Sequence, residues 1–161
     1  APQDQPRLKQ LGVTASMQPL HATSDMFTAG RHWGKRCAHA YALNSLQRQG
    51  ALLILGSDAP VESPNPFLGL HAAVTRRRVS GEPDENGWYP EQRLSLTQAL
   101  DGYTVNPAKS CGLGHSLGRI AVGCRADLIV LPQNPFALEA QSLWRLLPDL
   151  TLVDGRVVFQ R

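Results

Sequence analysis

The chain has 161 residues, a length that suits one folded domain or at most two small ones. Hydrophobic residues make up 42% of it, which is too many for a disordered tail. It carries 16 Lys and Arg residues against 13 Asp and Glu residues, a net charge of +3, and only 6% of its residues are aromatic. Nucleic-acid-binding proteins show a basic stripe interleaved with stacking aromatics, and membrane spans need about 20 apolar residues, so neither class is expected.

The first predicted elements are a short helix within residues 1–11, ending at Gly12, and a strand at 13–17. Residues 22–36 are polar and irregular, and we expect them to form a long loop. A helix over residues 37–49 should follow. With the next strand these elements make a strand–helix–strand unit, whose two strands should run parallel.

The rest of the chain is arranged around the apolar run at 51–55, which is cut off by Gly56-Ser57-Asp58 and a proline-rich loop. Its length and flanking residues indicate a strand buried on both faces, as in a parallel sheet covered by helices. Asp58 then lies at the carboxyl end of that strand, where ligands bind in α/β folds. The alternative is an ordinary turn, since Asp, Ser and Gly are common turn residues. His21 also follows a strand end, either as a surface histidine or as a polar group facing the same site.

The next helix should begin with Asn65 as its N-cap and Pro66 at its first position. Arg76–Arg78 should form its solvated end, where cations complement the helix dipole. Residues 79–93 are rich in Gly, Pro and acidic residues and predict a second long loop. Ser95–Gln98 is a capping box that opens a further helix.

Beyond residue 112 the helical periodicity disappears, and residues 118–131 and 151–160 contain strand segments. Asp154-Gly155, between two apolar stretches, predicts a two-residue hairpin with a type I′ turn. We therefore expect an α/β part at 1–112 and a small antiparallel β part at 113–161.

The three cysteines, Cys37, Cys111 and Cys124, are far apart and form no Cys-x-x-Cys pair. Neither a disulfide framework nor a zinc knuckle fits this spacing. Reduced, buried thiols in a cytoplasmic protein are the simplest interpretation.

Several segments, in this order along the chain, resemble the C-terminal part of a metal-dependent amidohydrolase of family 3, a branch that includes enzymes acting on N-substituted amides. The segments are QPLHATSD at 18–25, GSDAPVE at 56–62, GWYPEQRLSLTQAL at 87–100, TVNPAKSCGLGHSLGRIAVGCRADLIVL at 104–131 and TLVDGRVVFQR at 151–161. The resemblance covers nearly the whole chain.

The resemblance implies an α/β fold: the C-terminal portion of a (β/α)8 barrel, about the last two strands with their helices, joined to a small antiparallel β-sandwich part. In such enzymes the Asp at the end of strand eight binds the active-site metal and takes a proton from the attacking water. Asp58 matches that residue, and His21 would bind substrate. The parent activity would be hydrolysis of the carbon–nitrogen bond of a small-molecule amide, with a divalent metal, zinc, as cofactor.

The chain departs from the family in lacking the H-x-H pair and the other histidines that hold the metal. A catalytic zinc usually takes three protein ligands, so the chain alone should not be active. It is then a fragment of the enzyme, or one subunit of a split barrel, with a partner chain or a homo-oligomer covering its open edges. A non-catalytic structural or binding domain is the third alternative.

Overall fold

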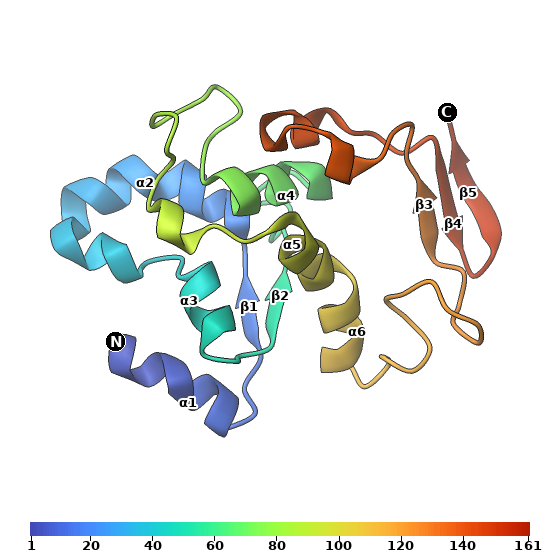
Figure 1. The fold of residues 1–161 in the computed structure, drawn as a ribbon, viewed down its shortest axis with the longest axis horizontal. Coiled ribbons are helices and arrows are strands. Elements are labelled where there is room, and N and C mark those ends of the chain that lie inside the picture. The colour runs from blue at the N-terminus through green and yellow to red at the C-terminus, as the bar shows by residue number, and fades with distance from the viewer.

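The protein is described by a computed structural model of residues 1–161, which contains two separate β-sheets (Figure 1). The first sheet pairs strand β1 (Ala15–Met17) with strand β2 (Leu53–Leu55) in parallel. The second is antiparallel, in the order β3 (Leu128–Val130), β4 (Leu150–Val153) and β5 (Arg156–Gln160). The chain is therefore a mixed α/β fragment rather than a closed barrel.

Six α-helices surround the parallel pair or follow it along the chain. They are α1 (Gln5–Gln10), α2 (Pro19–Trp33), α3 (Leu43–Arg48), α4 (Pro66–Thr75), α5 (Leu96–Tyr103) and α6 (Val105–Ser110). Short 3-10 helices lie at Pro2–Asp4, Gly34–His39, Pro90–Gln92, Pro135–Ala137 and Ala140–Arg145. None of the helices is both long and apolar enough to cross a membrane.

The predicted parallel strand pair is confirmed, with Ala15 opposite Leu53 and Met17 opposite Leu55. Leu53 and Leu55 are buried. Helix α5 lies close against β2, because a Cβ atom added to Gly102 would come within 2.7 Å of Leu55 Cγ. Strand β2 thus lies in the centre of the fold, and its carboxyl end leads to Asp58.

The prediction of a loop at 22–36 is wrong, because helix α2 runs from Pro19 to Trp33. Proline fits the first turn of a helix, where its missing N–H is not needed. Ala22, Met26 and Ala29 follow at helical spacing and are all buried. Because polar residues lie between these three, the apolar stripe is narrow and does not stand out in the sequence.

The predicted helix at 37–49 is interrupted. A 3-10 helix spans Gly34–His39 and α3 begins only at Leu43. Between them Tyr41 has a φ of 49°, in the left-handed region, which a continuous α-helix cannot contain.

The predicted helix starts at Asn65 and Ser95 are confirmed. Asn65 accepts a hydrogen bond from the N–H of Phe67 at 3.0 Å and so caps α4. Ser95 and Gln98 exchange hydrogen bonds with each other's backbone N–H groups at 3.2 Å and 2.8 Å, which completes the capping box of α5. These local motifs fix where the two helices begin.

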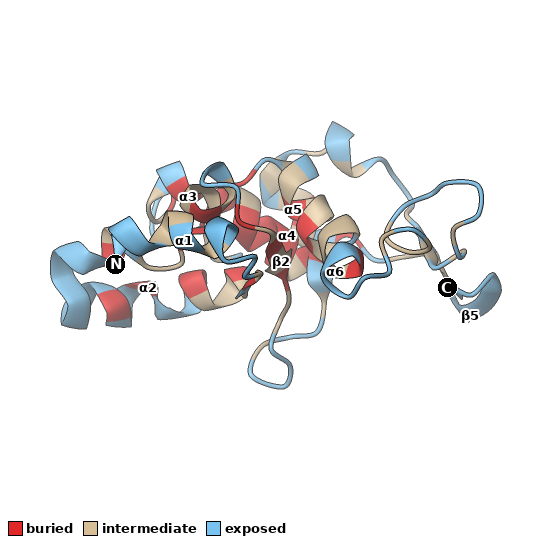
Figure 2. Cartoon of the chain, turned by 90° about the horizontal axis from the view of Figure 1, so that it is seen from below, coloured by how far each residue is buried: buried red, intermediate tan, exposed pale blue.

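One hydrophobic core joins the helices to the parallel strands, and Figure 2 shows its buried residues gathered around β2, α4 and α5. Two members, Leu143 and Leu146, come from the far side of the boundary predicted at residue 112. The 3-10 helix Ala140–Arg145, which contains Leu143, packs on α4. The division into 1–112 and 113–161 stays a prediction, and part of the second segment returns to the first.

The hairpin prediction at Asp154-Gly155 is confirmed, because both residues have positive φ angles, 51° and 75°, as a type I′ turn requires. Every residue of β5 is exposed. The three-stranded sheet lies at one end of the molecule, beyond α6 (Figure 1).

Candidate active site

The two parallel strands end at the same edge, and each leads directly to a predicted site residue. Strand β1 continues into α2, so that His21 lies in the first turn of that helix. Strand β2 continues through Gly56, whose N–H donates to the Met17 carbonyl at 3.1 Å, to Asp58. The topology therefore brings both residues to the carboxyl edge of the pair.

Asp58 lies in an exposed turn. Its φ is 56°, a left-handed conformation that Asp adopts more readily than most residues. Its carbonyl accepts a hydrogen bond from the N–H of Val61 at 2.8 Å, and Ala59 N–H donates to Ser57 Oγ at 3.3 Å. Within the chain the carboxylate itself makes no hydrogen bond and is open to a ligand or to solvent.

His21 is half-buried, and its Nε2 atom is removed from solvent without a hydrogen-bond partner. An unpaired buried polar atom costs free energy.

The residues of this chain do not fit a metal site by themselves. No group of three His, Cys, Asp or Glu side chains lies close enough together to hold an ion. The predicted zinc site therefore depends on donors that this chain does not contain.

His71 and the three cysteines are not among the predicted site residues. His71 is buried in α4, where its Nδ1 lies 3.3 Å from the Ala140 carbonyl, and burial lowers its pKa. The prediction of buried thiols holds for Cys37 and is wrong for Cys111, which is exposed, while Cys124 is half-buried.

The prediction of a solvated helix end at 76–78 is wrong for Arg76, which is fully buried. Its Nε donates to the Trp88 carbonyl at 2.9 Å and its Nη1 to the Tyr41 carbonyl at 3.1 Å. The guanidinium also lies over the Trp88 ring, 5.1 Å from the ring centre. Burial lowers the pKa of Arg76 to about 10. Trp88 thus anchors the loop at 79–93 on the end of α4.

Sequence reasoning missed one contact near the strand edge. Ser24 Oγ on α2 donates to Glu62 Oε1, in the loop that carries Asp58, at 2.5 Å. The two residues are 38 positions apart, and no local spacing rule connects them.

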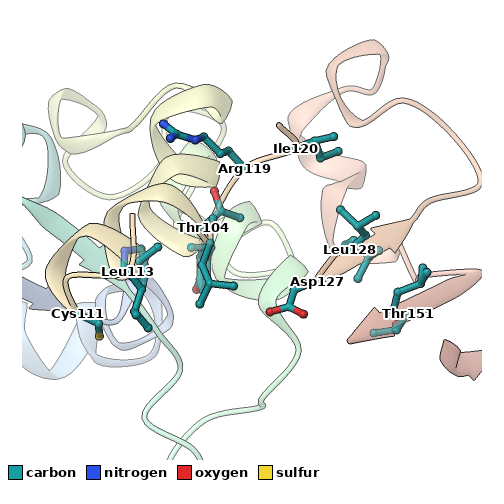
Figure 3. Close-up of a pocket in the computed structure, with 15 residues that line it drawn as sticks. Thr104, Cys111, Leu113, Arg119, Ile120, Asp127, Leu128 and Thr151 are labelled. Carbon is teal, nitrogen blue, oxygen red and sulfur yellow. The ribbon is translucent and has the colours of Figure 1, made fainter. Parts of the chain in front are cut away.

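A cavity of about 670 Å³ lies away from the strand edge. It lies between α5 and α6 on one side and the three-stranded sheet on the other, and in Figure 3 Leu113 and Leu128 face it from opposite sides. Its lining includes neither Asp58 nor His21.

The sequence profile of the amidohydrolase family matches residues 1–159. The chain belongs to the amidohydrolase family. This confirms the resemblance found in the sequence, and it covers essentially the whole chain.

Proteins similar in sequence to this chain are much longer than it is. It is 36% identical over 136 residues to the protein LONG AFTER FAR-RED 3 of Arabidopsis thaliana, covering 83% of this chain and 23% of that protein. It is 29% identical over 157 residues to the N-substituted formamide deformylase of Arthrobacter pascens, covering 96% and 28%. The chain spans about a quarter of the length of these relatives.

A solved structure shows the same partial coverage. The crystal structure of an uncharacterized metal-dependent hydrolase from Pyrococcus horikoshii aligns with a TM-score of 0.72 and 28% identity. The alignment covers 86% of this chain and 28% of that hydrolase. The amidohydrolase chain thus has the fold of one part of a larger family member.

Proposed function

We propose that this chain supplies one part of the active site of a metal-dependent hydrolase that cleaves carbon–nitrogen bonds of small non-peptide amides. Asp58 is its catalytic carboxylate, serving as general base and as one metal ligand, and His21 contacts substrate. The remaining donors come from outside these 161 residues. We call the chain together with the polypeptide that supplies them the assembled enzyme.

The observation that carries the proposal is the place of Asp58, at the carboxyl end of a buried parallel strand in an amidohydrolase. That edge is where parallel α/β folds bind ligands. The carboxylate is exposed and makes no hydrogen bond within the chain, so it can receive a ligand without breaking an existing contact.

General-base chemistry suits this side chain. A carboxylate within hydrogen-bond reach of a water molecule can take a proton from it as the water attacks the amide carbon. The same carboxylic acid can then pass that proton to the nitrogen of the departing amine. The products are a carboxylic acid and an amine, which balances the reaction.

The amide class is proposed from one relative. The Arthrobacter pascens protein is named as a deformylase of N-substituted formamides, and 96% of this chain aligns with it. N-alkylformamides are therefore the first substrates to test.

The test is Asp58→Ala in the assembled enzyme, with release of amine from an N-alkylformamide as the measurement. We expect turnover to fall by about 10²-fold or more, because removal of a general base typically costs that much. The matched control is Glu85→Ala, which removes an exposed loop carboxylate outside the strand edge and should keep turnover.

A second candidate is a non-catalytic structural or binding domain. Asp58 lines neither of the two main cavities, which favours this role for the chain in isolation. Unchanged turnover and unchanged metal content in Asp58→Ala would support this candidate and contradict the catalytic one.

A further inference from the structure

We infer that the hydrogen bond between Ser24 and Glu62 is a positioning contact that holds the Asp58 loop against the helix that carries His21. The inference rests on the proposed function, in which these two residues serve one site. Neither Ser24 nor Glu62 needs to touch substrate for this role.

The contact joins the helix that carries His21 to the loop that carries Asp58. Ser24 lies one helical turn after His21 on α2, and residues three apart share a helix face. Glu62 lies four residues after Asp58 in the loop between β2 and α4. Its Oε1 accepts a hydrogen bond from Ser24 Oγ.

The Ser24 end of the contact is held in place. Arg78 donates from Nε to the Thr23 carbonyl and from Nη2 to the Ser24 carbonyl, both at 2.9 Å. Thr23 is itself buried. The hydroxyl of Ser24 is therefore presented by a fixed backbone.

Beyond Gly56, the loop that carries Glu62 makes no other hydrogen bond to a distant part of the chain. Between residues 57 and 64 the other hydrogen bonds connect loop residues with one another or with Asn65. The Ser24–Glu62 bond is the one that ties this stretch to a different element. Without it the position of Asp58 would depend only on the chain at either end of the loop.

A positioning role predicts a specific kinetic effect. Misplacing a catalytic group by about 1 Å can cost about 10²-fold in rate. The loss should appear in kcat and not in KM, because substrate binding does not use this bond.

The test compares Ser24→Ala, Glu62→Ala, the double variant and Glu62→Gln in the assembled enzyme, with an N-alkylformamide as substrate. We expect each alanine variant to lower kcat about tenfold or more, and the double variant to be no worse than either single one, because all three lack the same bond. Glu62→Gln should keep most of kcat, because the amide oxygen still accepts from Ser24. Glu85→Ala, which removes an exposed carboxylate in another loop, is the control for charge and should keep kcat.

Hydrogen exchange of the same variants supplies a second measurement that does not depend on turnover. The Val61 amide, which donates to the Asp58 carbonyl, should exchange faster in both alanine variants and at the original rate in Glu62→Gln.

Three outcomes would contradict the positioning role of the Ser24–Glu62 contact. Additive losses in the double variant, a Glu62→Gln enzyme as slow as Glu62→Ala, or unchanged kcat and exchange in the alanine variants would each overturn the positioning role. Asp58→Ala measured alongside separates the two ideas. If it abolishes turnover while Ser24→Ala does not change it, the positioning contact fails and the proposed function stands. If Asp58→Ala keeps full turnover, the proposed function fails and the positioning role, which depends on it, fails too.

Discussion

At the scale of single residues, His71 links helix α4 to the segment that returns from the second half of the chain. Its Nδ1 lies 3.3 Å from the Ala140 carbonyl, and its Nε2 lies 3.5 Å from Thr75 Oγ1. Burial disfavours the charged imidazolium and lowers the pKa of His71 from its usual value near 6.5. The unfolded chain therefore binds a proton at a higher pH than the folded chain does.

This difference predicts a pH dependence of stability. As the pH falls below about 6.5, the unfolded chain takes up the proton first, so the free energy of unfolding should decrease until the folded pKa is passed. Urea unfolding of the chain at about pH 7.5 and about pH 5.5 measures the change. In His71→Gln the decrease should be smaller, while His115→Gln, which removes an exposed histidine, should behave like the original chain. Equal decreases in all three proteins would contradict the assignment.

Single residues also show what the sequence could and could not predict. The caps at Asn65 and Ser95 were predictable because each one binds within three residues of itself. The burial of Arg76 was not, because its partners, Tyr41 and Trp88, lie 35 and 12 positions away. Asp58 was predictable as a strand-end carboxylate, whereas the Ser24–Glu62 contact depends on how α2 meets a distant loop.

At the scale of elements, helices α4 and α5 approach closely because Gly69 has no side chain. The hydroxyl and ring of Tyr103 on α5 occupy the space that a Cβ atom at Gly69 would need. Gly30, in helix α2, has no neighbour within 4 Å of such an added atom. The two glycines therefore serve as a matched pair for testing this packing.

We expect Gly69→Ala to lower the free energy of unfolding by about 1–3 kcal/mol, because overpacking forces the helices apart. Gly30→Ala should raise it by about 0.5–1 kcal/mol, because alanine favours an exposed helix. Urea unfolding measures both. Adding Tyr103→Phe to Gly69→Ala removes the overlapping hydroxyl and should recover part of the loss. A Gly69→Ala chain as stable as Gly30→Ala would show that α4 and α5 do not depend on this close approach.

The elements that sequence analysis missed have a common physical reason. Helix α2 carries a narrow stripe of Ala and Met among polar residues, and its stability comes from burial against the rest of the chain. The split of the predicted helix at 37–49 depends on the left-handed turn at Tyr41, whose carbonyl binds Arg76. Strands β1 and β2 and the β4–β5 hairpin were predicted because apolar runs and turn residues mark them locally.

At the scale of the whole molecule, the chain leaves strand edges and apolar surface without a covering element. The parallel sheet has only two strands, so the outer edges of β1 and β2 are unpaired. Strand β5 forms one edge of the second sheet, and Val157, Val158 and Phe159 on it are all exposed. Such edges pair readily with other chains. This openness agrees with the finding that the chain spans about a quarter of its relatives.

We therefore expect the isolated chain to self-associate, through β5 in particular. Light scattering during gel filtration should give a mass that rises with protein concentration. Val158→Lys should reduce the rise, because a charged side chain on an edge strand opposes pairing. The control is Val79→Lys, which places the same charge at an exposed valine in the loop after α4 and should leave association unchanged. A monomeric mass at every concentration would mean that the uncovered strand is not an association surface. Equal effects of the two lysines would mean that net charge, and not the edge of β5, controls association.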